Sequence, residues 1–187
     1  MRYICKVNML NVKFMNTIYF AGGCFWGTEH FFQKIRGVVS TRVGYANSIV
    51  EAPSYEQVCT SATNAAECVA VEFDPQLVTL PFLIRLYFMT IDPTSLNRQG
   101  GDKGTQYRTG IYYTDPSQLP VIKATVDELA KDYTEPVVVE ILPLENFYPA
   151  ELYHQHYLDK NPGGYCHINP RLFAIAKEAV DPEAPVK

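Results

Sequence analysis

The sequence lacks paired cysteines and long apolar runs. Its five cysteines are Cys5, Cys24, Cys59, Cys68 and Cys166, an odd number with no C-x-x-C spacing. A disulfide-framework protein shows an even and denser set, and a zinc site needs paired ligands that these residues do not offer. No stretch approaches the roughly 20 apolar residues of a transmembrane helix. We therefore expect a cytoplasmic protein with reduced thiols, no membrane span and no bound metal.

Positive charge is also scarce. The 16 Lys and Arg are outnumbered by 20 Asp and Glu, and the formal net charge is −4. Without a long basic run, the sequence offers no surface typical of nucleic-acid binding. The 187 residues fit one domain better than two, and residues 1–14 lack the unbroken apolar centre of a secretory signal. We expect a monomer with a loose N-terminal arm at residues 1–16 and a single domain at residues 17–187.

Hydrophobic periodicity and turn residues divide the chain into strands and helices. Strands are expected at 17–21, 38–45, 68–73, 110–113 and 136–141, and helices at 25–35, 80–90, 117–131 and 149–158. Residues 92–108 lack apolar periodicity, and loops of that length in compact domains are often functional. The expected strands and helices do not alternate strictly along the chain, and the chain is not composed of strands alone. This order predicts an α+β fold, a two-layer sandwich of a mixed sheet and packed helices, with a long coil tail at the C-terminus.

Cys24 stands at the turn between the first strand and the first helix. Gly22 and Gly23 let the backbone turn sharply, so Cys24 falls where free N–H groups and the helix dipole favour a negative charge. Both effects would lower the pKa of the thiol, and the thiolate is the nucleophile. A buried, inert cysteine remains the alternative. Phe25 and Trp26 point apart on a helix, so we expect one of them to line a surface pocket.

Five blocks of sequence contain this cysteine or follow it. They are GCFWGTE (Gly23–Glu29), SYEQVCT (Ser54–Thr60), DPTSLNRQGGDKGTQYRTGIYY (Asp92–Tyr113), FYPAELYHQHYL (Phe147–Leu158) and KNPGGYC (Lys160–Cys166). In this order they resemble blocks of the type A peptide methionine sulfoxide reductases. The resemblance implies a ferredoxin-like core and a catalytic domain that reduces methionine S-sulfoxide, free and in proteins, to methionine. It also implies thioredoxin or a similar dithiol as the reductant, with no other cofactor.

The resemblance implies a role for each candidate site residue. Cys24 is the nucleophile, Glu67 protonates the sulfoxide oxygen, and Cys166 is the resolving thiol that condenses with the sulfenic acid on Cys24. The implied substrate-binding residues are the aromatic pair Phe25 and Trp26 for the methyl group, the hydroxyl donors Tyr55 and Tyr107, and their polar neighbour Asp102. A carboxyl group in an apolar pocket has a raised pKa, which would keep Glu67 protonated near neutral pH.

The sequence departs from the family pattern at two places. Ala65 stands where the family commonly has a histidine, which bears on the loop geometry before Glu67. No cysteine follows Cys166, so recycling would involve two cysteines only. Cys59 matches a family cysteine that we interpret as structural, and Cys68 is given no role.

Two other functions remain open on the residues alone. A cysteine hydrolase could use Cys24 and Glu67 but would need a histidine base oriented near the thiol. None of the four histidines, at positions 30, 154, 156 and 167, has a suggestive sequence context. A non-enzymatic redox-sensing domain would keep a reactive Cys24 and need neither an acid nor a methyl pocket.

Overall fold

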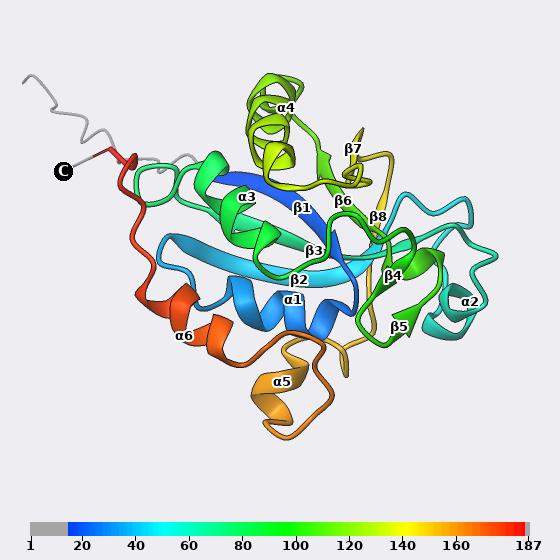
Figure 1. Ribbon diagram of the computed structural model, residues 1–187. Helices are drawn as coiled ribbons and strands as arrows, with labels where there is room; N and C mark the ends of the chain where they lie inside the picture. The colour runs from blue at the N-terminus through cyan, green and yellow to red at the C-terminus, as the bar shows by residue number, and fades with distance from the viewer. Residues whose placement is uncertain (1–14, 186–187) are drawn as a thin grey trace, which may run out of the picture.

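Strands and helices alternate irregularly in the computed structural model, which describes residues 15–185 (Figure 1). The strands are β1 (Asn16–Gly22), β2 (Val38–Ala46), β3 (Ala66–Phe73), β4 (Arg98–Gln99), β5 (Asp102–Lys103), β6 (Thr109–Tyr113), β7 (Glu140–Pro143) and β8 (Phe147–Pro149). The helices are α1 (Phe25–Phe32), α2 (Tyr55–Cys59), α3 (Leu80–Phe88), α4 (Gln118–Leu129), α5 (Tyr157–Lys160) and α6 (Arg171–Glu178), with 3-10 turns η1 (Thr105–Tyr107) and η2 (Ala130–Asp132). None of the helices in residues 15–185 is long and apolar enough to cross a membrane. The expected N-terminal arm lies outside this range except for Met15 and Asn16, and Asn16 already belongs to β1.

Six strands form one sheet in the order β7-β6-β1-β3-β2-β8. Neighbouring strands are antiparallel except β6 and β7, which run parallel. Pairs such as Phe20 with Val69 fix the register of the two central strands. Because side chains alternate along a strand, this register places the large apolar side chains of both strands on one face. The predicted α+β fold with a mixed sheet is confirmed.

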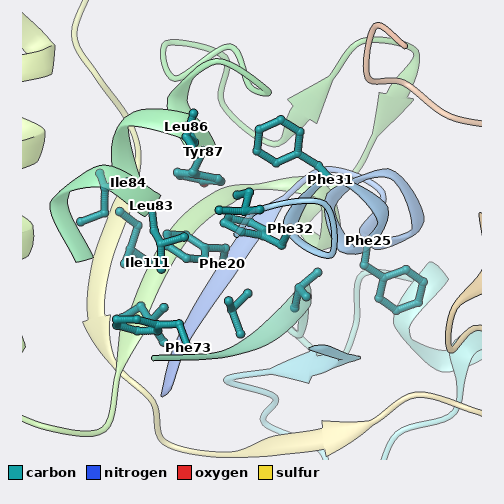
Figure 2. Packing of buried hydrophobic residues seen from close by; sticks show 14 of the residues in the cluster. Phe20, Phe25, Phe31, Phe32, Phe73, Leu83, Ile84, Leu86, Tyr87 and Ile111 are labelled. Atoms are coloured by element: carbon teal, nitrogen blue, oxygen red, sulfur yellow. The ribbon is translucent and has the colours of Figure 1, made fainter. Parts of the chain in front are cut away.

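The main core lies between this sheet and the helices α1 and α3 (Figure 2). Phe20 of β1 stacks on Phe32 of α1 with ring centroids 4.6 Å apart, and the Tyr87 ring of α3 lies 4.9 Å from the Phe20 ring. The Tyr87 hydroxyl donates to the carbonyl of Ala21 near the end of β1. Each fully buried ring of this kind contributes roughly 1.5–3 kcal/mol. This packing fixes α1 against the end of β1, and so it positions Cys24 between them.

The expected helix over residues 149–158 is wrong. Strand β8 ends at Pro149, turns follow, and only Tyr157–Lys160 (α5) are helical. The side-chain amide of Gln155 accepts from the Val43 N–H at 3.0 Å and donates to the Val43 carbonyl at 2.9 Å. The segment therefore bonds to the edge of β2 instead of to its own backbone. His156 interrupts it with a φ of 53°, a left-handed conformation that a regular helix does not contain.

The C-terminal segment is not a continuous coil either. Residues 161–170 lack regular structure, but Arg171–Glu178 form α6. Ala176 is fully buried in the main core, and Leu172 and Phe173 pack against it. The apolar stripe at this three- and four-residue spacing is a helical signal, which corrects the expected coil tail. Phe173 meets the ring of His30 edge-on at 4.8 Å, so α6 lies against α1.

Short elements lie in two segments where the sequence predicted neither a helix nor a strand. Helix α2 starts with a capping box in which Ser54 and Gln57 exchange hydrogen bonds. The long stretch at 92–108 contains the two-stranded hairpin of β4 and β5 and the turn η1. The last expected strand, at 136–141, pairs with β6 only from Glu140 onward.

Candidate active site

Cys24 lies directly after a sharp turn between β1 and α1. Gly23 has a φ of 79°, which strongly favours glycine, and a Cβ at this position would come within 2.7 Å of the Gln99 Cβ. The Thr28 hydroxyl lies 3.3 Å from the carbonyl oxygens of both Gly22 and Cys24, which closes the first turn of α1. Cys24 is the N-cap residue of this helix and is 6% exposed. Its predicted position at the helix start is confirmed.

The Cys24 thiol is not a preformed thiolate. Burial raises its pKa well above the ordinary value, and the carboxyl group of Glu67 adds to the rise. The backbone N–H of Trp26 acts in the opposite direction, so the favourable effect of the helix start is present but is smaller than the cost of desolvating the anion. The expected lowering of this pKa is therefore wrong, and Cys24 holds its proton at neutral pH.

Glu67 reaches toward the same turn from β3. Glu67 is 2% exposed, and its Oε2 accepts a hydrogen bond from the backbone N–H of Phe25 at 3.0 Å. Burial raises the pKa of Glu67 to about 8, because this single hydrogen bond does not offset desolvation. A carboxylic acid that is mostly neutral at pH 7 therefore lies beside Cys24, as the apolar-pocket argument predicts.

The adjacent aromatic residues divide between the core and the surface. Phe25 is 1% exposed, and its ring faces those of Tyr45 and His154. Trp26 is half-buried: its Nε1 donates to Nδ1 of His154 at 2.9 Å, and its ring stacks on Tyr157 at 3.7 Å. Burial lowers the pKa of His154, so a neutral imidazole accepts this hydrogen bond. The indole is thus held in one orientation while part of its surface stays accessible.

Tyr55 and Tyr107 come from separate segments, and both neighbour Glu67. Tyr55 begins α2 with its ring 4.6 Å from that of His154, whereas Tyr107 ends the turn η1. Burial raises the pKa of both phenols, and the Glu67 carboxyl contributes to both shifts. Each phenol is therefore a neutral O–H group that can donate a hydrogen bond near the acid.

Asp102 joins the hairpin of β4 and β5 to the C-terminal segment. Its Oδ2 accepts from the hydroxyl of Tyr165 at 3.0 Å. The carboxyl group also contributes to the raised pKa values of Cys24, Tyr107 and Cys166. Asp102 therefore lies among the expected site residues, although it is far from most of them in sequence.

Cys166 packs against the first turns of α1. A Cβ on Gly27 would lie 2.8 Å from the Cys166 Sγ, so only glycine leaves room for the sulfur. Gly27 follows Cys24 by three residues and lies on the same face of the helix, and Cys166 contributes to the raised pKa of Cys24. Ile168, 2% exposed and also beside Gly27, anchors the segment. The structure thus brings all eight expected site residues to one region around the start of α1.

The sequence interpretation missed two histidines at this site. His154 supports Trp26 and faces Tyr55, and His167 lies with its Nε2 3.2 Å from the position of a Cβ on Gly23. Both histidines lie in or directly after the resembling blocks, which was the available signal. The structure thus adds His154 and His167 to the site, although no site role was predicted for them from the sequence.

Two other expectations concern the loop before Glu67 and the helix α2. Ala65 is 1% exposed and belongs to the main core, and its N–H donates to the Thr63 hydroxyl at 3.2 Å. Cys59, interpreted as structural, is exposed at the end of α2.

Among residues 15–185 there is no group of three or more His, Cys, Asp or Glu side chains that could hold a metal ion.

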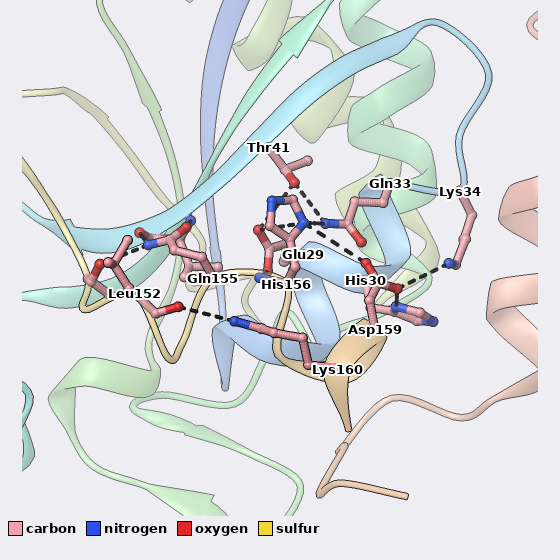
Figure 3. A network of polar contacts seen from close by, with 12 residues as sticks. Glu29, His30, Gln33, Lys34, Thr41, Leu152, Gln155, His156, Asp159 and Lys160 are labelled. Atoms are coloured by element: carbon pink, nitrogen blue, oxygen red, sulfur yellow. Dashed lines mark hydrogen bonds and ion pairs between the residues drawn. The ribbon is translucent and has the colours of Figure 1, made fainter. Parts of the chain in front are cut away.

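A polar network joins the second turn of α1 to the turns and helix α5 that follow β8 (Figure 3). Glu29, 1% exposed, accepts from the Thr41 hydroxyl at 3.2 Å and from the His156 N–H at 2.8 Å. Asp159 forms an ion pair with Lys34, and its carboxyl group lies 3.1 Å from Nδ1 of His30. These contacts fix the part of the chain that supports the Trp26 indole.

The chain is similar to known proteins. A family model described as peptide methionine sulfoxide reductase matches residues 16–182. The chain belongs to this family. The peptide methionine sulfoxide reductase MsrA of Lachnoclostridium phytofermentans is 55% identical to this family member over 163 residues, covering 87% of the chain and 98% of the relative.

Solved structures of related reductases have the same fold. Reduced Mxr1 from Saccharomyces cerevisiae has a TM-score of 0.79 and 39% identity, and the match covers 83% of the chain and 91% of the yeast protein. Mxr1 in complex with Trx2 has a TM-score of 0.56 and 25% identity, over 81% of the chain and 91% of Mxr1.

Proposed function

We propose that this reductase converts methionine S-sulfoxide, free and in proteins, to methionine, with Cys24 as the nucleophile and Glu67 as the proton donor. One observation supports this most directly: a buried thiol and a mostly neutral carboxylic acid meet at the same turn, with the Glu67 Oε2 bonded to the N–H of Phe25. A sulfoxide needs attack at its sulfur and a proton for its basic oxygen. The pair supplies both.

In the first step, the Cys24 sulfur attacks the sulfoxide sulfur while Glu67 gives its proton to the sulfoxide oxygen. The Cys24 thiol proton then replaces the one that Glu67 lost. The oxygen ends on Cys24 as a sulfenic acid, and methionine leaves. This order suits a thiol whose pKa is raised by burial, because the thiol proton departs only as the new bond forms.

The substrate is held by one apolar and one polar wall. We assign the methyl contact to the accessible indole of Trp26, with the buried ring of Phe25 behind it. The neutral hydroxyls of Tyr55 and Tyr107 donate to the sulfoxide oxygen, with Asp102 nearby. Exchanging the methyl group and the oxygen would place the oxygen against an aromatic ring without a partner, so the walls select one epimer. The family resemblance implies that it is the S epimer.

Cys166 then attacks the sulfenic acid, forming a disulfide with Cys24 and releasing water. We propose thioredoxin or a similar dithiol as the reductant, with no further cofactor; Trx2 is the partner of the yeast relative. A surface pocket of about 400 Å³ borders Cys166, which gives a dithiol a route to the disulfide for exchange. We place this repair of oxidised proteins in the cytoplasm, carried out by a monomer with no nucleic-acid or membrane partner.

A ferredoxin-like arrangement of the core is also proposed. The chain order β1-α1-β2-β3-α3-β6 and the order β6-β1-β3-β2 across the sheet support it. Both helices of this unit contribute to the same core, which is what a two-layer sandwich requires.

A stereospecific assay tests the function. Each epimer of methionine sulfoxide is supplied separately with thioredoxin and its reducing system, and methionine is measured. We expect the S epimer alone to be consumed, no turnover by Cys24→Ser, and one equivalent of methionine without recycling by Cys166→Ser. Glu72→Gln, at the other end of β3 from Glu67 and bonded to Ser40, is the control and should turn over at the wild-type rate. Thioredoxin-driven activity in Cys24→Ser would refute the proposal.

A further inference from the structure

His167 is a titratable side chain close to Cys24 that the steps above do not use. Both of its ring nitrogens are buried. Among residues 15–185 the Gly22 carbonyl is a weak partner for one of them, and the other nitrogen has no hydrogen-bond partner. Buried polar atoms are normally paired. An imidazole with a free nitrogen next to the turn that carries Cys24 is available to accept a proton.

Cys166 and His167 lie on either side of the turn that carries Cys24. The Cys166 Sγ lies 2.8 Å from the position of a Cβ on Gly27, and the His167 Nε2 lies 3.2 Å from that of a Cβ on Gly23. Gly23 directly precedes Cys24, and Gly27 follows it by three residues. Two consecutive tail residues thus place a thiol and an imidazole against the two glycines that flank Cys24 at the start of α1.

The charged group that faces His167 is the carboxylate of Asp102. Burial lowers the pKa of His167, and Asp102 and the Gly22 carbonyl act against this effect. The imidazole is therefore neutral and able to accept a proton at pH 7. Asp102 would stabilise the imidazolium that forms, as a carboxylate beside a histidine does in general acid–base catalysis.

The resolution step needs such a group. Burial raises the pKa of Cys166, so Cys166 is a thiol, whereas the attacking species in exchange reactions is the thiolate. The hydroxyl group that leaves Cys24 as hydroxide must in turn be protonated. His167 follows Cys166 in the chain and lies against Gly23, the residue before Cys24, so one base can serve both needs by accepting the proton and then returning it.

We propose that His167 accepts the proton of Cys166 as its sulfur attacks the Cys24 sulfenic acid, and passes that proton to the departing hydroxide. The sulfur–sulfur bond forms and the S–O bond of Cys24 breaks. The Cys166 sulfur is oxidised, the Cys24 sulfur is reduced, and the hydroxide leaves as water. The inference rests on the proposed function, because the sulfenic acid is the product of sulfoxide reduction.

A single-turnover experiment without external reductant separates the two steps. The enzyme is mixed with methionine S-sulfoxide and quenched at intervals, and both released methionine and remaining thiols are counted. For His167→Gln and His167→Phe we expect methionine release within about twofold of the wild type. Loss of the second thiol should slow by roughly a hundredfold, the lower end for a lost general base. Arg85→Gln, which breaks the ion pair between Arg85 of α3 and Glu128 of α4, is the control and should leave both steps unchanged.

The pH profile distinguishes proton transfer from a structural role. In the wild type, disulfide formation should decline as the pH falls below the pKa of His167, which is lower than 6.5 because of burial. Both variants should lose this decline, whereas a packing defect would slow the step and leave the profile in place. Wild-type rates, or a wild-type profile, in both variants would overturn the inference. If the wild type releases no methionine, the proposed function fails instead, and one equivalent of hydrogen peroxide can form the sulfenic acid for the same comparison.

Discussion

Glu29 and Glu67 have the same chemistry and nearly the same burial, yet the fold surrounds them differently. They are 1% and 2% exposed, and burial raises the pKa of both. Glu29 on α1 accepts from the Thr41 hydroxyl and the His156 N–H, and the His156 ring lies 4.0 Å away. Among residues 15–185, Glu67 on β3 accepts one hydrogen bond, from the backbone N–H of Phe25. A carboxyl group surrounded by donors holds elements together, whereas one with few donors keeps a proton that it can give away.

Replacing Glu67 by glutamine should have the largest effect. The amide keeps an acceptor for the Phe25 N–H but has no acidic proton, so turnover of methionine S-sulfoxide should fall roughly 10²–10⁴-fold. Glu72→Gln is the matched control, because Glu72 is on the same strand and bonds to Ser40 instead. Activity of Glu67→Gln within a few-fold of the wild type would show that the proton comes from elsewhere.

The pH dependence of stability sharpens the same comparison. The pKa of Glu67 is about 8 in the native state and about 4.3 in an unfolded chain, so the native state binds more protons between these values. Its contribution to stability is therefore complete below about pH 4 and is lost as the pH rises through 8, on the order of a few kcal/mol. Urea unfolding at several pH values should show this loss in the wild type but not in Glu67→Gln. A difference between the two proteins that does not vary with pH would contradict it.

Replacing Glu29 by alanine should reduce stability and spare the chemistry. The change leaves the Thr41 hydroxyl and the His156 N–H without their acceptor, at a cost of about 1–3 kcal/mol. Denaturant unfolding measures the loss, and turnover per folded molecule should stay close to that of the wild type. A large loss of turnover in a stable Glu29→Ala protein would remove the distinction between the two glutamates.

The smallest expected effect is at Thr41. Thr41→Val removes one hydroxyl donor to Glu29 and should lower the free energy of unfolding by about 0.5–1.5 kcal/mol. Thr41→Ser keeps the hydroxyl and is the control. If both variants unfold at the same denaturant concentration as the wild type, the hydroxyl does not contribute to the network in Figure 3.

Local patterns in the sequence predicted the elements around Cys24. Strand β1, the glycine turn and the start of α1 follow from alternation, glycine pairing and helical spacing, all of which act over a few residues. The failed helix at 149–158 shows the limit of such patterns. There, Gln155 bonds to Val43, which is 112 residues away, and no local pattern reports that partner. The hairpin of β4 and β5, whose strands pair with each other, was likewise not predicted because residues 92–108 lack apolar periodicity.

The sequence by itself determined which groups are available: a cysteine at a helix start, acids, phenols and a second cysteine in blocks that resemble one family. Only the tertiary structure decided their protonation and their partners. It raised the pKa of Cys24 where the helix start alone would lower it, and it made one buried glutamate an acid and the other a structural acceptor. The reason is that desolvation and hydrogen bonding sum over groups distant in sequence, such as Glu67 and Phe25, 42 residues apart, or Trp26 and His154, 128 apart.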